Sequence, residues 1–199
     1  MGVFGGSFDP PHVGHAIVAK GLLEQLQLDR LLVIPAGVPP HRSVALPASV
    51  RLDLTRKLFH DLAPIEVSDL EQALLKPSYT IDTLRVLVSR FPDSQLVLIM
   101  GTDQFSVLDT WKDFEKLPEL AEIAVMRRGG DEPMRSTGTA EIEYIVVDVM
   151  RIDISSSQVR QRLREGRSIR SLVPDSILQD IERAWTEHVS KQTSESESI

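Results

Sequence analysis

Short apolar runs alternate with helical patterns along most of the chain. Most of these runs are unbroken by polar residues, which is typical of strands buried on both faces of a parallel sheet. The alternation predicts a single doubly wound (Rossmann-like) α/β domain with a mostly parallel sheet. The expected strands, flanked by Gly, Pro or Asp, are 2–5, 30–35, 65–68, 95–100, 122–126 and 144–147.

Helical patterns fill the spaces between these strands. Segments 14–26 and 48–62, and a third that begins at Thr80, place apolar side chains on one face at helical spacing. Segments 155–165 and 175–189 predict two C-terminal helices. The rest of the chain is rich in Ser and Glu, so we expect one domain over 1–189 and a disordered tail over 190–199.

The bulk composition narrows the classes of function. The 199 residues carry a net charge of −7, which argues against a surface for nucleic acid. No window approaches the roughly 20 apolar residues of a membrane span, and no signal-peptide pattern is visible. The chain has no cysteine, which excludes disulfides, thiolate zinc sites and cysteine nucleophiles. We therefore expect a cytoplasmic protein without a membrane or nucleic-acid partner.

The segment from Gly5 to His15 points most directly to chemistry. It combines paired glycines, a proline turn and two histidines, directly before a helical pattern. Glycines let backbone N–H groups approach an anion, and a helix N-terminus adds a favourable dipole. His12 and His15 can share one face of the first helical turn. The segment predicts a polyphosphate cradle with two donors; in the plainer interpretation it is a turn with capping or surface histidines.

A second phosphate site is expected near the C-terminal end. Ser155 and Gln158 form a capping-box pattern, so a well-capped helix is the plain interpretation. Three consecutive serines at a positive helix end also suit a phosphate group. Arg160 lies within the first two turns and can hold phosphate oxygens through two hydrogen bonds.

Two segments that follow expected strands carry further candidates. The loop 35–42 ends in a basic pair that suits an anion, unless the charge is incidental. Asp103 follows an apolar strand, where a carboxylate commonly accepts hydrogen bonds from ribose hydroxyls. Trp111 has polar neighbours that indicate a loop, where its indole could stack on a flat ring; a buried core role is the alternative.

In this order the segments resemble the nucleotidyltransferase superfamily with an H-x-G-H motif, and more narrowly the bacterial nicotinate-nucleotide adenylyltransferases. The motifs are Gly-Gly-Ser-Phe-Asp-Pro-Pro-His-Val-Gly-His, Pro-Pro-His-Arg, Ser-Tyr-Thr-Ile-Asp-Thr-Leu, Gly-Thr-Asp with Trp111, and Ile-Ser-Ser-Ser-Gln-Val-Arg. The resemblance implies transfer of the AMP moiety of ATP to nicotinate mononucleotide. The products would be nicotinate adenine dinucleotide and pyrophosphate, in NAD biosynthesis.

The resemblance also implies roles for individual residues. His12 and His15 would be catalytic, Trp111 would stack on the pyridine ring, and the backbone N–H groups of Thr80 and Lys112 would bind the nicotinate carboxylate. We expect Mg²⁺ to accompany ATP, held by phosphates and water rather than by a protein metal site. The residues expected to bind ATP are Gly6, Ser7, His12, His15, Gly101, Asp103, Ser155, Ser156 and Arg160. Those expected to bind the mononucleotide are His41, Arg42, Thr80, Trp111 and Lys112.

Two segments depart from the family's pattern, and Asp9 allows more than one role. Arg127 and Arg128 lack the following proline of the family's Arg-Pro-Gly turn, which weakens any role for either arginine. Lys112 stands where an aromatic residue is frequent, so a backbone N–H contact survives this change but a side-chain contact does not. Asp9 lies near the phosphate loop and could equally be a turn residue.

Other interpretations stay open on the sequence alone. The same transfer could go to nicotinamide mononucleotide or to a phosphopantetheine-type acceptor, although two N–H donors aimed at one group favour a carboxylate over an amide. A class I aminoacyl-tRNA synthetase fragment shares a similar motif but needs a basic tRNA-binding surface. A non-catalytic nucleotide-binding regulator needs the phosphate cradle but can dispense with His12 or His15. Adenylyl transfer requires that His15 and Ser156 face one cavity.

Overall fold

The computed structural model describes residues 1–40, 43–73, 77–128 and 141–196. Its centre is a six-stranded sheet in the order β3-β2-β1-β4-β5-β6, in which all neighbouring strands pair in parallel. This is the strand order of the doubly wound dinucleotide-binding fold, so the predicted fold class is confirmed. The strands are β1 (Gly2–Gly6), β2 (Leu31–Pro35), β3 (Ile65–Val67), β4 (Val97–Gly101), β5 (Glu122–Arg128) and β6 (Ile145–Val149).

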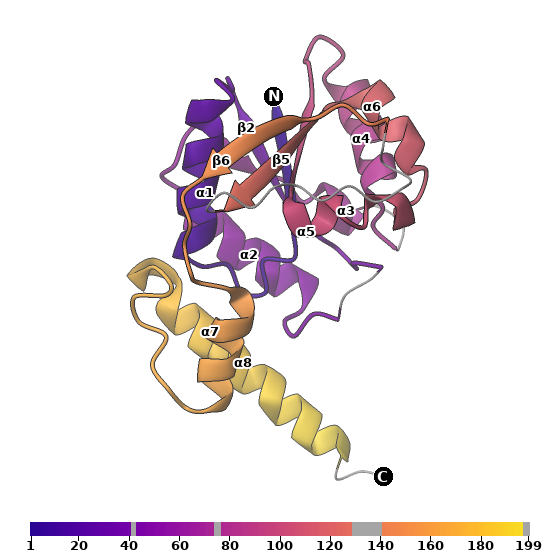
Figure 1. The fold of residues 1–199 in the computed structure, drawn as a ribbon. Helices are drawn as coiled ribbons and strands as arrows, with labels where there is room; N and C mark the ends of the chain where they lie inside the picture. Colours follow the sequence, from indigo (N-terminus) through magenta and orange to yellow (C-terminus); the bar gives the residue numbers. More distant parts are fainter. Residues whose placement is uncertain (41–42, 74–76, 129–140, 197–199) are drawn as a thin grey trace.

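Helices cover both faces of the sheet (Figure 1). Successive strand side chains point to opposite faces, so each of the four central strands, β1, β2, β4 and β5, contributes to two apolar clusters. Val33 of β2 belongs to the cluster under α1 (Val13–Gln25), α2 (Ala48–Phe59), α7 (Ser156–Arg164) and α8 (Asp175–Ser196). Its neighbour Ile34 belongs to the opposite cluster, under α3 (Leu70–Ala73), α4 (Thr80–Arg90), α5 (Thr102–Phe105) and α6 (Leu117–Leu120).

The central strands are buried on both faces, as their unbroken apolar runs predict. All five residues of β2 are buried, and so are the first four of β4. The edge strand β6 is different, since Ile145 and Val146 are exposed. The paired strand ends therefore form a rigid platform, and the loops that leave them are placed by the sheet.

The structure moves several boundaries of the predicted elements. Helix α2 ends at Phe59 instead of residue 62, and β5 continues to Arg128. Helix α8 continues to Ser196, past residue 189 where the sequence analysis ended it, because no Gly or Pro interrupts that stretch. The predicted domain over 1–189 and the predicted disordered tail over 190–199 stay predictions, and residues 197–199 lie outside the described part. The four-residue helices α3, α5 and α6 are too short to leave a periodic signal.

The two C-terminal helices lie together at the lower end of the domain in Figure 1, with α8 alongside α2. Lys57 of α2 forms an ion pair with Asp180 of α8. Trp185 of α8 is 7% exposed and belongs to the core cluster on this face. Within the described part of the chain, no helix is long and apolar enough to cross a bilayer.

Candidate active site

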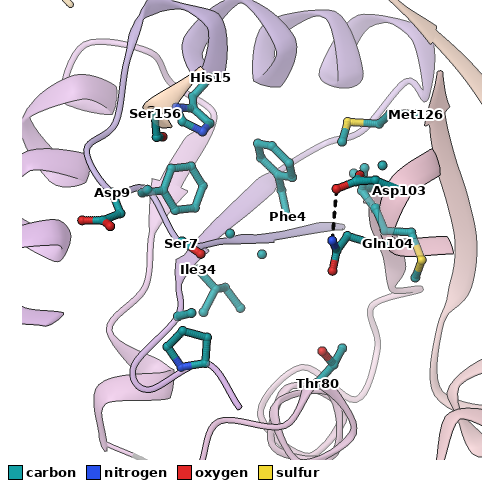
Figure 2. A pocket seen from close by; sticks show the side chains of 18 of the residues that line it. Phe4, Ser7, Asp9, His15, Ile34, Thr80, Asp103, Gln104, Met126 and Ser156 are labelled. Atoms are coloured by element: carbon teal, nitrogen blue, oxygen red, sulfur yellow. Dashed lines mark hydrogen bonds between the residues drawn. The ribbon is translucent and has the colours of Figure 1, made fainter. Parts of the chain in front are cut away.

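A cavity of about 830 Å³ opens where the sheet reverses its strand order, between β1 and β4. Ligands of doubly wound folds bind at this point, beyond the carboxyl ends of the strands. The volume falls within the range of roughly 300–1,000 Å³ that is typical of small-molecule sites. Its walls come from the loops after β1, β2, β4 and β6 and from the starts of α1, α4 and α7 (Figure 2).

Most of the predicted site residues line this one cavity. His41 and Arg42 are the exceptions, because they lie outside the described residues. The structure therefore brings together segments from both ends of the chain, while the role of each side chain stays a prediction. The predicted residues that line the cavity are Gly6, Ser7, His12, His15, Thr80, Gly101, Asp103, Trp111, Lys112, Ser155, Ser156 and Arg160.

The turn after β1 rests on a buried phenylalanine that the sequence analysis did not select. Phe8 has a left-handed backbone (φ 47°) and is 1% exposed. Such a conformation is uncommon for a bulky residue, so the surrounding packing must hold it. The Phe8 ring centre lies 4.8 Å from that of His15 and 5.9 Å from that of Phe4. Phe8 thus packs against His15 and belongs to the core cluster beneath α1.

The two histidines are arranged against each other at the start of α1. Their ring centres are 3.8 Å apart, and the backbone N–H of His12 donates to Nδ1 of His15 at 3.1 Å. Because Nδ1 accepts this hydrogen bond, the neutral His15 ring carries its proton on Nε2. The ring therefore has a donor nitrogen on the side away from its own backbone contact. His12 itself is 6% exposed and lines the same cavity.

Asp9 is a loop-fixing residue. Its carboxylate is 3% exposed and accepts hydrogen bonds from the backbone N–H groups of Ala45 (2.7 Å) and Leu46 (2.9 Å). These contacts join the turn after β1 to the segment that leads into α2. The structure therefore supports the interpretation of Asp9 as a turn residue.

The serine-led helix α7 is fastened directly to this turn. Ser156 donates to the carbonyl oxygen of Pro10 at 2.9 Å, and Arg160 Nη1 donates to the carbonyl oxygen of Asp9 at 2.7 Å. The side chains of Ser155 and Gln158 exchange hydrogen bonds with each other's backbone N–H, so the predicted capping box is confirmed. The predicted convergence of the segments 5–15 and 154–160 is confirmed as well.

Arg51 is the most important residue that the sequence analysis missed. It is fully buried, and its guanidinium donates to the carbonyl oxygens of Leu46 (3.1 Å), Ser7 (2.7 Å) and Gly37 (2.9 Å). Burial lowers the pKa of Arg51, and nearby carboxylates partly oppose this effect. The signal was present, since Arg51 lies three residues before Leu54 on the apolar face of its helix.

A second buried polar cluster closes the cavity beside α4. The Glu71 carboxylate accepts from Thr83 Oγ1 at 3.0 Å, and Ser78 Oγ accepts from the backbone N–H of Val38 at 3.2 Å. Burial raises the pKa of Glu71, against the effect of its hydrogen bonds. Gly37 is needed here because a Cβ would lie only 2.3 Å from the backbone oxygen of Glu71.

Gly101 and Asp103 lie together where β4 ends and α5 begins. Gly101 precedes α5, and a Cβ on it would lie 2.6 Å from Oδ1 of Asp103. The glycine therefore lets this carboxylate fold back over the strand end. The other carboxylate oxygen accepts from Gln104 Nε2 at 3.1 Å (Figure 2).

Trp111 lies on a loop between two short 3₁₀ turns, 108–110 and 114–116, as its polar neighbours predict. It lines the cavity and is partly buried, whereas Trp185 belongs to the core. Lys112 extends across the first turn of α4, with Nζ 2.8 Å from Oδ2 of Asp82. The loop and α4 together form the wall opposite α7.

Arg127 points to a different surface. Its guanidinium pairs with Asp148 on the neighbouring strand β6, with Nη2 3.1 Å from Oδ2. Arg127 is not among the residues that line the cavity. This placement agrees with the weak case that the sequence made for it, and the side chain of Arg128 lies outside the described part.

The chain is a nucleotidyltransferase, in which two helix starts meet at the switch point of a parallel sheet. The chain belongs to the cytidylyltransferase-like family, whose model matches residues 3–162. Its similarity to nicotinate-nucleotide adenylyltransferases is confirmed by curated relatives. A protein of Exiguobacterium sibiricum, named "Probable nicotinate-nucleotide adenylyltransferase", is 39% identical over 183 residues, which cover 92% of this chain and 95% of that protein.

Further comparisons agree. A protein of Thermus thermophilus with the same printed name is also 39% identical, over 92% of this chain and 96% of its own length. A solved Plasmodium falciparum nicotinic acid mononucleotide adenylyltransferase complexed with NaAD matches with a TM-score of 0.69 at 19% identity. That match covers 96% of this chain and 94% of the other, and it shows that the fold is shared.

Proposed function

We propose that the chain transfers the AMP moiety of ATP to nicotinate mononucleotide, giving nicotinate adenine dinucleotide and pyrophosphate in NAD biosynthesis. One observation carries the proposal: the starts of α1 and α7 meet at a single cavity, and α4 and the Trp111 loop form its opposite wall. The first two helix starts suit a triphosphate, and the opposite wall suits a second, flat and anionic substrate. The names of the curated relatives support the same activity.

The reaction needs no nucleophile from the protein. A phosphate oxygen of the mononucleotide is already ionised and attacks the α-phosphorus of ATP in line. The new bond joins this oxygen to the α-phosphorus, while the bond from the α-phosphorus to the bridging oxygen breaks and pyrophosphate leaves with its electrons. Catalysis is then a matter of positioning and charge stabilisation.

His12 and His15 supply the charge stabilisation. His15 accepts a backbone hydrogen bond at Nδ1, so Nε2–H is the donor of its ring, and we assign this donor to phosphate oxygens. Such preorganised donors act where negative charge grows in the transition state. The backbone N–H groups at the start of α7, with Ser155, Ser156 and Arg160, hold the departing pyrophosphate.

The remaining contacts orient the two substrates. Gly6 and Ser7 hold the triphosphate, and Gly101 and Asp103 hold the adenosine ribose. These assignments rest on the placement of all four residues around the cavity and on the family resemblance.

The acceptor lies against α4 and the Trp111 loop. The first backbone hydrogen bonds of α4 are donated by Asp82 and Thr83 to the Tyr79 carbonyl oxygen. The N–H of Thr80 lies before these donors, at the helix end where backbone N–H groups have no acceptor within the helix. It and the backbone N–H of Lys112 bind the nicotinate carboxylate, and the indole of Trp111 stacks on the pyridine ring. His41 and Arg42 approach the mononucleotide phosphate or the triphosphate in this proposal.

Nucleotidyltransferases of this family generally use a divalent metal with ATP, and we assign Mg²⁺ to that role. The described residues contain no group of three or more His, Asp or Glu side chains arranged to hold a metal, and the Asp9 carboxylate already binds two backbone N–H groups. These residues fit a magnesium ion held mainly by phosphate oxygens and water, where it neutralises triphosphate charge. We place the reaction in the cytoplasm, where ATP is abundant.

A pyrophosphate-release assay tests the proposal. ATP is combined with nicotinate mononucleotide, nicotinamide mononucleotide or phosphopantetheine at equal concentrations. We expect the highest kcat/KM with nicotinate mononucleotide. A higher value with another acceptor overturns the assigned acceptor, and no pyrophosphate with any of them overturns adenylyl transfer.

A further inference from the structure

We propose that the side chain of Lys112 is a positioning residue that fastens the Trp111 loop to the first turn of α4. The proposal deepens the proposed function, because it concerns the acceptor wall of the same cavity. Lys112 Nζ donates to Oδ2 of Asp82 at 2.8 Å and lies 4.7 Å from the ring centre of Tyr79. Tyr79 caps α4 and Asp82 lies in its first turn, so one ammonium group spans the turn that contains Thr80.

A second contact ties the same loop to the same helix. Arg85 of α4 donates to Oδ1 of Asp82 (3.2 Å) and to Oδ2 of Asp113 (3.4 Å). Asp113 directly follows Lys112 and has a left-handed backbone (φ 52°), which Asp tolerates better than most residues. Two adjacent loop residues of opposite charge are therefore anchored to α4.

The anchoring matters because the two predicted carboxylate donors belong to different elements. The N–H of Thr80 is part of α4, whereas the N–H of Lys112 is part of the loop, and both residues line the cavity. Two donors bind one carboxylate well only when their separation is held within a few tenths of an ångström. Exposed ion pairs contribute little to global stability, so their effect here is on geometry.

The side chain and the backbone of Lys112 perform separate tasks. The ammonium group contacts Asp82 and Tyr79, and the backbone N–H serves the substrate. Any substitution except proline keeps the N–H and changes only the fastening.

Kinetics of Lys112→Met test the proposal, since methionine keeps the length and removes the charge. We expect the KM for nicotinate mononucleotide to rise about three- to tenfold, with kcat and the KM for ATP changed less than about twofold. Lys112→Arg should restore the KM, because arginine can pair with Asp82 and stack on Tyr79. Lys116→Met is the matched control, since Lys116 pairs with Asp113 three residues earlier in the chain and not with a residue of α4 in that contact.

A double-mutant cycle checks the contact itself. Asp82→Asn should raise the same KM, and adding it to Lys112→Met should raise the KM little further, because both changes remove one interaction. A wild-type KM in Lys112→Met, or a double variant whose effect is the product of the two single effects, overturns the proposal.

Acrylamide quenching of tryptophan fluorescence gives a readout that needs no substrate. Trp185 is 7% exposed, so quenching reports mainly on Trp111. The quenching constant should rise in Lys112→Met and stay at the wild-type value in Lys112→Arg and Lys116→Met. An unchanged constant in Lys112→Met overturns the fastening whether or not the chain transfers AMP. A wild-type protein without activity toward nicotinate mononucleotide counts against the proposed function alone.

Discussion

Ser156 and Pro10 are 146 positions apart in the sequence and are joined by a hydrogen bond of 2.9 Å. This contact places the serine-led start of α7 against the turn that carries His12 and His15. Figure 2 shows Ser156 and His15 close together on one side of the cavity. Had the two segments lain on opposite faces of the sheet, no single triphosphate could reach both, and adenylyl transfer would have no structural basis.

Removing the His15 side chain tests its role as a donor. His15→Ala should lower kcat on the order of a hundred- to a thousandfold, the usual effect of losing one preorganised donor in a site of this kind. Pyrophosphate release measures the rate, and thermal unfolding checks that the fold is kept. His60→Ala is the control, since its side chain is 80% exposed beside Asp61. Near-wild-type turnover in His15→Ala would refute the role.

Trp111→Ala tests the stacking role. If the indole covers the pyridine ring, the KM for nicotinate mononucleotide should rise at least about fivefold, in line with base–aromatic stacking of about 1–3 kcal/mol. The KM for ATP should stay within about twofold, because ATP binds at the other end of the cavity. An unchanged KM for the mononucleotide leaves Trp111 only a packing role against its apolar neighbours.

Arg51 should be critical for stability. Arg51→Met leaves three carbonyl oxygens without their donor and should lower the free energy of unfolding by at least about 3 kcal/mol. Arg56→Met on the same helix breaks an exposed pair with Asp69 and should cost less than about 1 kcal/mol. Urea unfolding of both variants measures the difference, and equal losses contradict the role given to Arg51.

Glu71 should make stability depend on pH in a defined direction. Burial raises its pKa above the ordinary value of 4.5, so the folded state binds the proton more tightly than the unfolded state. Its contribution to stability is fully present below pH 4.5 and is lost as the pH rises through the folded pKa. The stability of the wild type relative to Glu71→Gln should therefore fall from about pH 4 upward in urea unfolding. A relative stability that is constant or rises with pH is the contrary result.

Gly37→Ala should distort the loop after β2. The new Cβ would meet the backbone oxygen of Glu71, which cannot move aside as a side chain can, so we expect a loss of about 1–3 kcal/mol. Gly21→Ala is the opposite case, because Gly21 lies inside α1 and its Cβ would meet nothing within 4 Å. That variant should gain about 0.5–1 kcal/mol from helix propensity. Thermal unfolding distinguishes the two, and a neutral Gly37→Ala would show that the loop can relax.

The sequence was sufficient for the sheet and the longer helices, because their hydrophobic periods are local properties of the chain. It was also sufficient for the capping box of Ser155 and Gln158, which needs only four consecutive residues. For Arg51 it placed a charge on the apolar face of a helix but did not show which carbonyl oxygens the guanidinium binds, and for Glu71 it gave no signal, because the partners of both side chains are contributed by other segments. Phe8 was missed for the same reason, since its left-handed backbone is held by packing against Phe4 and His15.

The sequence by itself determined the doubly wound class, the segments that can bind phosphate and the pair of histidines, since each depends on residue types at short spacing. Only the tertiary structure decided that these segments share a cavity, that Asp9 fixes a loop, and that Lys112 reaches across α4. Those features depend on contacts between distant residues, which form only when the parallel sheet orders its strands and brings their carboxyl ends to one edge.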